Sequence, residues 1–126
     1  MTLIEIINAK NALKNYFEKT PPNATMYKII KLIKYAEEQE KYFNEVLNQL
    51  LQKYGERDAA GKFIIADEGK GYKIKQEFSY KYLTDYLALQ NTGLDDFTPT
   101  ITLAELSPLE IKLGDMYHIL PVIKNA

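Results

Sequence analysis

The run from Ala24 to Tyr54 constrains the fold more than any other feature of this sequence. It holds no proline or glycine, and its apolar residues recur at alternating intervals of three and four, the spacing of one face of an α-helix. The stripe consists of Met26, Ile29, Ile33, Ala36, Phe43, Leu47, Leu50 and Tyr54, interrupted by the polar residue Glu40. At 1.5 Å per residue this helix is about 45 Å long, so other elements or a partner chain must cover it.

A first helix is predicted from Leu3 to Glu18. Thr2 and Glu5 have the spacing of a capping box at its start, and the two prolines in Thr20–Asn23 stop it. Asn23 is expected to be the N-cap of the long helix. Because the linker is short, the two helices should form an antiparallel hairpin. In that hairpin Glu40 either faces a lysine such as Lys10 or marks a partly exposed position.

Gly55 has the place of a C′ glycine after the long helix. Two segments rich in strand formers follow, Lys62–Ile65 and Tyr72–Lys75, and they predict a β-hairpin. A third helix is expected from about Gln76 to Asn91, with Gly93 as its stop. We expect this helix to cover the far half of the long helix, Phe43 to Tyr54, which the first helix is too short to reach.

The last quarter of the chain gives shorter patterns. Thr100–Leu103 is typical of a strand. Leu109–Lys112 fits a second strand, but a helix starting at Ser107 fits as well, because Ser107 to Glu110 also has capping-box spacing. Asp115 is a candidate N-cap for a short helix, Met116–Leu120. The whole predicts an α+β fold: a long central helix in an antiparallel helical hairpin, a small antiparallel β-sheet and additional short helices, all in a single domain, residues 1–126.

Composition narrows the classes of function. The formal net charge is -1, so no global charge draws the chain to nucleic acid or to an anionic membrane. There is no cysteine, which excludes disulfides. The sequence has no run of about 18 apolar residues that could span a membrane. Near the start, Glu5 interrupts the short apolar run, so a signal peptide is not expected. These features predict a cytoplasmic protein without a membrane partner.

No motif in the sequence predicts catalysis. Gly55–Lys62 resembles a phosphate-binding loop, but its spacing and the residue after Lys62 do not fit one. His118 is the only histidine, so a histidine-rich metal site is excluded. An acid–base pair of His118 with Asp115 is a weaker interpretation. The acidic pairs Asp67–Glu68 and Asp95–Asp96 match no calcium pattern. We therefore expect no enzyme, no metal and no cofactor.

Two regions are candidate contact surfaces: the part of the apolar stripe beyond the first helix, and the hairpin with the tyrosines around it. Their residues are Phe43, Leu47, Leu50, Tyr54, Tyr72, Lys73, Lys75 and Tyr80. Lysines and tyrosines also alternate from Lys70 to Tyr82, as on surfaces that bind single-stranded nucleic acid. The near-neutral total charge favours instead a hairpin with one packed face and one wet face.

Part of the sequence resembles a group of small phage and prophage proteins of unknown function. The resemblance rests on Asn48–Asp58, with its Lys-Tyr-Gly-Glu segment after a long helix, and on Gly61–Ile64 in the turn and hairpin. The layouts of Leu87–Leu94, Ile101–Leu106 and Asp115–Ile123 are also similar, so the resemblance extends over about two-thirds of the chain. It implies a protein made in a bacterial cytoplasm from a phage or prophage genome, and it transfers no activity and no site residues.

These observations favour a non-enzymatic protein-interaction module of phage-like origin that acts in virion assembly or on a host protein. Its partner would be a phage protein, a host protein or a second copy of the chain. The first alternative is an inhibitor of a bacterial defence system, such as an anti-CRISPR protein. The second is a nucleic-acid-binding accessory protein that uses the segment Lys70–Lys81.

Overall fold

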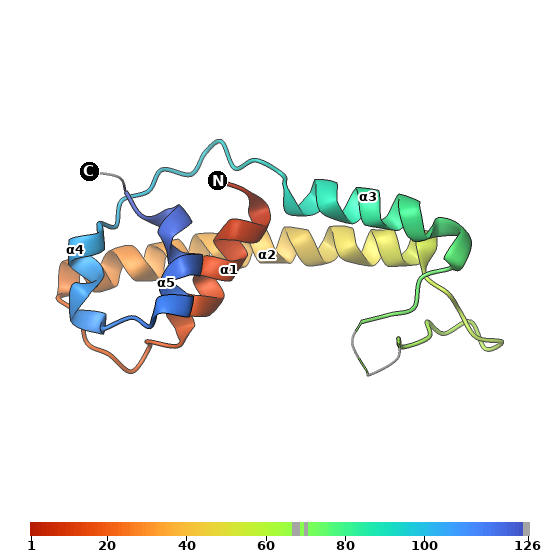
Figure 1. Cartoon of the computed structure of the whole chain (residues 1–126), viewed down its shortest axis with the longest axis horizontal. Coiled ribbons are helices and arrows are strands. Elements are labelled where there is room, and N and C mark those ends of the chain that lie inside the picture. The colour runs from red at the N-terminus through yellow and green to blue at the C-terminus, as the bar shows by residue number, and fades with distance from the viewer. Residues whose placement is uncertain (67–68, 70, 125–126) are drawn as a thin grey trace. The chain divides into compact units, whose positions relative to one another are not determined.

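The computed structural model describes residues 1–66, 69 and 71–124, and these are mostly helical (Figure 1). The α-helices are α1 (Leu3–Lys14), α2 (Asn23–Tyr54), α3 (Ser79–Gln90), α4 (Leu103–Leu106) and α5 (Leu113–Ile119). Short 3₁₀ helices are η2 (Gln76–Phe78), η3 (Ser107–Leu109) and η4 (Leu120–Val122). Across the described residues there is no β-strand, only isolated bridges. The predicted α+β fold with a small sheet is therefore wrong.

The chain divides into two compact units. Unit 1 consists of Met1–Lys41 and Asn91–Ala126, and unit 2 of Tyr42–Gln90. Helix α2 contributes its first part to unit 1 and its last part to unit 2. The long helix predicted from Ala24 to Tyr54 is confirmed as one uninterrupted element. Whether both units unfold as the one domain expected from the sequence stays a prediction.

In unit 1, α1 and the first part of α2 form the predicted antiparallel hairpin. Lys10 Nζ lies 2.7 Å from Glu40, whose side chain is 32% exposed, so both alternatives for this residue hold. Lys14 Nζ lies 3.8 Å from Glu37. The pairing is antiparallel because residue numbers rise along one helix as they fall along the other. The capping box of Thr2 and Glu5 is also confirmed.

The ends of these two helices differ slightly from the prediction. Helix α1 stops at Lys14 rather than Glu18, and residues 15–18 continue as turns. Asn23 is the first residue of α2 rather than its N-cap, because the Pro22 carbonyl already accepts a hydrogen bond of 2.9 Å from the Met26 N–H. A proline can hold this place since its own carbonyl remains available.

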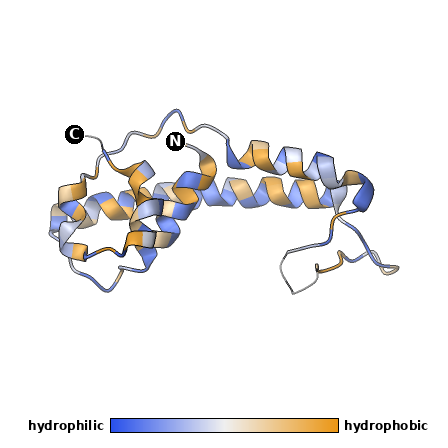
Figure 2. Ribbon diagram, viewed as in Figure 1, coloured by the Kyte–Doolittle hydropathy of each residue, from blue (hydrophilic) through white to orange (hydrophobic). Residues whose placement is uncertain are grey.

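The core of unit 1 forms where α5 and η4 pack against α1. Figure 2 shows hydrophobic and hydrophilic residues alternating along these helices, as expected of amphipathic segments. A parallel bridge joins Ile101 to Ile123, and the Lys124 N–H donates to the Ile101 carbonyl at 2.8 Å. The largest fully buried side chains of this core are Leu3, Ile6, Leu106, Ile119 and Val122.

The strand predicted over Thr100–Leu103 is wrong. Thr102 is the N-cap of α4, with a complete capping box to Glu105. The Thr-x-x-Glu spacing prevails here over the β propensity of the run, because the two side chains satisfy backbone N–H groups that a strand would leave for a partner. The Lys28 ammonium also lies 3.0 Å from Glu105. The Thr102 backbone N–H, followed by Lys28, lowers the pKa of this carboxyl.

The two interpretations of the Leu109–Lys112 region resolve in favour of a helical turn, and the strand is wrong. Ser107–Leu109 is the 3₁₀ helix η3, and Glu110 ends it in the left-handed region at φ 52°. The next helix also starts earlier than predicted: α5 begins at Leu113, with Lys112 as N-cap, so Asp115 lies in its first turn. An acidic residue in that turn suits the positive end of the helix dipole.

In unit 2, α3 runs alongside the last part of α2 (Figure 1). The contact consists largely of aromatic rings: Phe43 and Tyr86 have centroids 6.3 Å apart, and Tyr54 and Tyr82 6.4 Å. The Tyr54 hydroxyl donates to Asp85 at 2.7 Å. The predictions that a helix occupies about Gln76 to Asn91, and that it covers the far half of the long helix, are confirmed.

The predicted β-hairpin is not a strand pair. Three extended segments, residues 55–57, 63–65 and 72–74, each pair with the other two through single bridges. Their hydrogen bonds close a cycle: Ile64 N–H to Glu56 at 3.0 Å, Lys73 N–H to Ile64 at 2.7 Å, and Glu56 N–H to Lys73 at 2.8 Å. Each pair of segments is joined by a single bridge, so these segments form no continuous ladder.

Gly55 does end α2, but without the left-handed conformation of a C′ glycine: the positive-φ glycines of the described residues are Gly61, Gly69 and Gly71. A Cβ on Gly55 would lie 2.6 Å from the Leu51 carbonyl oxygen and 2.9 Å from Phe63 Cδ1. A glycine is therefore needed here because the backbone is closely approached, not because of its φ angle.

Candidate interaction surfaces

The predicted contact residues divide into buried and exposed groups. Phe43 and Tyr54 are buried in the α2–α3 contact, with 8% and 4% of their surface exposed. They belong to the packed interior of unit 2 rather than to a free surface. Leu47 and Leu50 are half-buried, whereas Lys73 and Lys75 are exposed. Tyr72 and Tyr80 are exposed to 52% and 81%.

Two of these residues line one groove in unit 2. Leu47 of α2 and Tyr72 of the extended segments face a cavity of about 380 Å³. Its other lining residues are Asn44, Asn48, Leu51, Gly71, Ile74 and Tyr82. Leu47 is thus covered in part by the residues around it, which explains why it is half-buried.

The lysines predicted to face nucleic acid have other neighbours. Lys73 Nζ lies 3.8 Å from Glu56, and Lys75 Nζ lies 5.9 Å from the centre of the Phe78 ring. Both lysines line a shallow hollow that Glu56 and Glu77 also line. The two carboxylates offset the two ammonium groups, so this hollow has little net attraction for phosphate.

Helix α3 carries a second apolar face that the sequence prediction missed. Tyr82, Tyr86 and Leu89 are less exposed and face the unit interior. On the outside Tyr80, Leu83 and Leu87 recur at intervals of three and four and are exposed to 81%, 52% and 46%. We call these three residues the α3 outer stripe. Of these three residues, the contact residues predicted from the sequence include Tyr80 but not Leu83 or Leu87, although their spacing to Tyr80 could have revealed the stripe.

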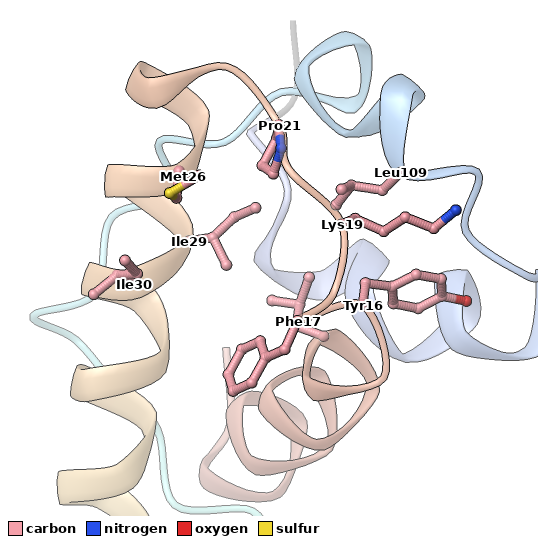
Figure 3. Close-up of a pocket in the computed structure, with 9 residues that line it drawn as sticks. Tyr16, Phe17, Lys19, Pro21, Met26, Ile29, Ile30 and Leu109 are labelled. Carbon is pink, nitrogen blue, oxygen red and sulfur yellow. The ribbon is translucent and has the colours of Figure 1, made fainter.

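Unit 1 contains an apolar groove that the sequence prediction also missed (Figure 3). It lies between the end of α1, the linker and the first turns of α2, and it has a volume of about 340 Å³. In Figure 3, Ile29 and Pro21 point toward the hollow, whereas the Tyr16 ring and the end of Lys19 extend away from it. The lining residues are Leu13, Tyr16, Phe17, Lys19, Pro21, Met26, Ile29, Ile30 and Leu109.

Tyr16 fixes one wall of this groove. Its hydroxyl donates to Asp115 at 2.7 Å and accepts from the Lys112 N–H at 2.8 Å. Desolvation, followed by the hydrogen bond with Asp115 and the charge of that carboxylate, raises the pKa of the tyrosine, whereas the Lys112 N–H acts in the opposite direction. These bonds connect the end of α1 to the start of α5 and hold the groove wall in place.

The weak candidates for chemistry are occupied by structural contacts. Asp115 accepts from Tyr16 and Asn15, while His118 is exposed with its ring against Tyr117. In the loop that resembles a phosphate site, Asp58 accepts from the Ala60 and Lys62 N–H groups at 2.9 and 3.0 Å. Those amides therefore have an internal acceptor.

The acidic pair that the structure describes, Asp95–Asp96, also makes a structural contact. Asp96 accepts from the Tyr35 hydroxyl at 2.8 Å, and Asp67–Glu68 lie outside the described residues. Within the described ranges, no three acidic or histidine side chains gather as a metal site would require. In the same part of the chain, no helix combines the length and apolarity needed to cross a bilayer.

Comparison with known proteins gives no relative. No protein-family model, curated protein or solved structure matches this chain.

Proposed function

We propose that this protein is a non-enzymatic protein-interaction module and that the α3 outer stripe is its principal contact surface. The observation that carries the proposal is that α3 is apolar on two faces. One face packs within unit 2, and the other presents Tyr80, Leu83 and Leu87 to solvent. A helix that is needed only as a cover would have a polar outer face.

The composition of the α3 outer stripe supports a protein partner. Large apolar and aromatic side chains without charge are typical of the centre of protein interfaces. Thr84 lies between the leucines, and its hydroxyl donates to the Tyr80 carbonyl of the same helix at 2.9 Å. This polar group is therefore already satisfied and would cost little to bury.

Unit 2 has few buried apolar side chains, although the α3 outer stripe leaves apolar side chains exposed. Among its described residues the buried hydrophobics are Phe43, Tyr54 and Leu89. Burying one large apolar side chain contributes about 1.5–3 kcal/mol, so a unit with few buried residues would gain by placing Leu83 and Leu87 inside. That they remain in solvent supports a surface that a partner covers.

We further propose that the module comes from a phage or prophage and acts in the bacterial cytoplasm or in the virion, in assembly or on a host protein. This part rests only on the sequence resemblance described above. The identity of a captured partner separates the possibilities, because a capsid or tail protein indicates assembly and a defence nuclease indicates inhibition of host defence.

The α3 outer stripe can be tested with a double substitution, Leu83→Glu and Leu87→Glu. Tagged protein from infected or lysogenic host cells should capture a partner that the double variant loses. Leu113→Glu in α5 with Leu120→Glu in η4 is the matched control, since both leucines are also exposed, to 89% and 51%.

The outcomes of this comparison are distinct. Retention of the partner by the α3 variant and loss by the control variant would move the contact surface to the region of Leu113 and Leu120. Circular dichroism must show that both variants keep the helical content of the wild type. Light scattering adds the test for a second copy as partner: a wild-type dimer that becomes a monomer only in the α3 variant would identify self-association. Absence of any partner and of any oligomer would contradict the interaction module itself.

A further inference from the structure

We infer that residues 95–99 form a strap that opens and closes over a groove of unit 1, with the side chain of Tyr35 as its latch. Opening exposes Leu32 and Val122, two aliphatic side chains that are buried while the strap is closed. The strap is a conformational device within unit 1 and is independent of the α3 outer stripe.

The chain on either side of the strap is fixed to unit 1 by backbone hydrogen bonds. Before the strap, the Leu94 N–H donates to the Met1 carbonyl at 3.0 Å. After the strap, the Ile101 carbonyl accepts from the Lys124 N–H at 2.8 Å, and Ile101 forms a parallel bridge with Ile123. The strap can therefore move as a short loop while these two anchor points stay in place.

Between the anchor points the backbone of the strap is not paired with another segment. Residues 95 and 96 form a turn, and within the described ranges residues 95–99 make no backbone hydrogen bond to a distant segment. Pro99 has no N–H to donate, and it favours an extended conformation at Thr98. The Lys28 ammonium donates to the next carbonyl, that of Thr100, at 3.3 Å. A segment with so few backbone bonds opens at a low free energy.

Tyr35 of α2 holds the middle of the strap through two contacts. Its hydroxyl donates to the Asp96 carboxylate at 2.8 Å, and its ring stacks on Phe97 with centroids 5.4 Å apart. Tyr35 and Phe97 are both half-buried. Burial, followed by the Asp96 carboxylate, raises the pKa of Tyr35 to about 12, as expected for a hydroxyl that is kept from water. Loss of this one side chain would therefore remove both contacts.

The space between the strap and α2 is a groove of about 600 Å³, which we call the strap groove. Its lining includes Phe97 and Thr98 of the strap, Leu32 and Tyr35 of α2, and Val122 of η4. Leu32 and Val122 are exposed to only 6% and 1%. Because these two residues line the same groove as the strap, movement of the strap admits solvent or a partner to them without unfolding of a helix.

A single cysteine can measure the opening, because the chain has no cysteine of its own. Leu32→Cys places a thiol in the strap groove, and its reaction with a water-soluble maleimide follows the open fraction when closing is faster than reaction. Addition of Tyr35→Ala should raise the rate at least about tenfold, equivalent to roughly 1.4 kcal/mol. Tyr35→Phe, which keeps the ring and loses the hydroxyl, should give a smaller increase.

Two matched substitutions test whether the latch is specific. Tyr27→Phe removes a hydroxyl from another tyrosine of the strap groove, but Tyr27 is 65% exposed, so the labelling rate should not change. Asp96→Ala should raise the rate, because Asp96 accepts the latch hydrogen bond. Asp95→Ala, which removes the same charge one residue earlier, should leave the rate unchanged.

A thiol in the core distinguishes local opening from unfolding of unit 1. Ile6→Cys replaces a fully buried residue, so its thiol reacts when the unit unfolds, and the Tyr35 substitutions should not change its rate. Equal acceleration at positions 6 and 32 would show that Tyr35 stabilises the whole unit, and no acceleration at position 32 would show that it is not a latch. Either result would overturn the inference.

A second reporter guards against a Leu32→Cys variant that does not fold. Val122→Cys places the thiol on a different element, and the Tyr35 substitutions should raise its labelling rate in the same order. Circular dichroism must show wild-type helical content for each variant. Leu83→Glu, on the α3 outer stripe, should leave both labelling rates unchanged, so the strap and the proposed contact surface can fail separately.

Discussion

The two units share helix α2 but surround it in different ways. In unit 1, α1, α5 and η4 enclose aliphatic side chains, and Ile6 and Ile119 are completely buried. In unit 2 a single helix, α3, lies against α2, and the contact depends on rings such as those of Phe43 and Tyr86. An apolar stripe enclosed by several elements becomes a core, whereas a stripe covered by one helix remains partly exposed to solvent.

This difference explains the choice of side chains in each unit. Tyrosine suits a contact that is partly exposed to solvent, because its ring packs while its hydroxyl forms a hydrogen bond. The Tyr54 hydroxyl does so with Asp85. Leucine and isoleucine offer no such polar end and therefore gather where solvent is excluded. We expect unit 2 to open with a lower free energy than unit 1, since it has fewer buried apolar contacts. The following predictions test this comparison, beginning with the largest effect.

The largest effect is expected from a cavity in the core of unit 1. Ile6→Ala should lower the free energy of unfolding by about 2–5 kcal/mol, because Ile6 is fully buried and the space it leaves cannot fully close. Chemical denaturation followed by circular dichroism measures the loss. Leu87→Ala, at an exposed position of unit 2, should change stability by no more than about 0.5 kcal/mol.

Hydrogen exchange of the Ile6→Ala variant tests the separateness of the two units. In the wild type, amides of α1 should be better protected than those of α3. The substitution should lower protection in α1 and α5 and leave α3 unchanged. An equal loss in α3 would show instead that residues 1–126 unfold as one cooperative domain.

The next effect concerns the ion pair between α1 and α2. Glu40→Ala should cost about 2 kcal/mol, because it leaves the Lys10 ammonium, whose side chain is 4% exposed, without its partner at 2.7 Å. Replacing both residues, Lys10→Met with Glu40→Leu, should recover most of this loss. Thermal unfolding of the single and double variants measures both changes.

The control for this pair is a nearby contact of the same hairpin. Lys14→Ala removes a partner of Glu37 at 3.8 Å, where both side chains are largely in solvent, and should cost less than about 1 kcal/mol. A loss for Glu40→Ala no larger than this would mean that the ammonium of Lys10 is readily hydrated.

Two glycines should respond in opposite directions to the same substitution. Gly55→Ala in unit 2 should destabilise by about 1–3 kcal/mol, because the new Cβ would meet the Leu51 carbonyl oxygen at 2.6 Å. Gly114→Ala lies within α5 of unit 1 and meets nothing within 4 Å. It should stabilise by about 0.4–1 kcal/mol through the unfolded chain. Equilibrium unfolding in urea compares the two, and a stabilising effect of Gly55→Ala would contradict the close approach at that glycine.

The smallest effect is a pH dependence in unit 1. Burial, followed by the Asp96 carboxylate, raises the pKa of Tyr35 from 10.0 to about 12. Because the folded pKa lies above the unfolded one, the contribution to stability is present below pH 10 and is lost as pH rises through 12. Tyr35→Phe should remove the late step from a spectrophotometric titration of tyrosinate. The exposed control Tyr27→Phe should keep it, and loss of the step in the control would contradict the assignment.

Part of the fold could be predicted because its determinants are local. The spacing of apolar residues predicted α2 and α3, and Thr2 with Glu5 predicted the start of α1. The contact of Lys10 with Glu40 could be given as one of two alternatives because a short linker leaves few ways to fold the first helix back. At Thr102 two local signals disagreed, and the cap prevailed over the β propensity.

The candidate surfaces were predicted less well. Tyr80, a predicted contact residue, is exposed, but Phe43 and Tyr54 are buried, because the residues of α3 that cover them are distant in the chain. The groove of unit 1 was missed for a similar reason. It exists only because Phe17, Ile30 and Leu109 come together, and no spacing within one segment reveals that.

The sequence by itself determined where the helices form and which of their faces are apolar, because hydrogen bonds and side-chain spacing within one helix involve only neighbours of three and four positions. The tertiary structure alone decided that residues 55–57, 63–65 and 72–74 form a closed cycle instead of a sheet. It also decided which apolar residues remain exposed. Both outcomes depend on which distant segments meet. A backbone group can form its hydrogen bond with several other segments, and an apolar side chain can pack against several, and the local sequence does not favour one of them.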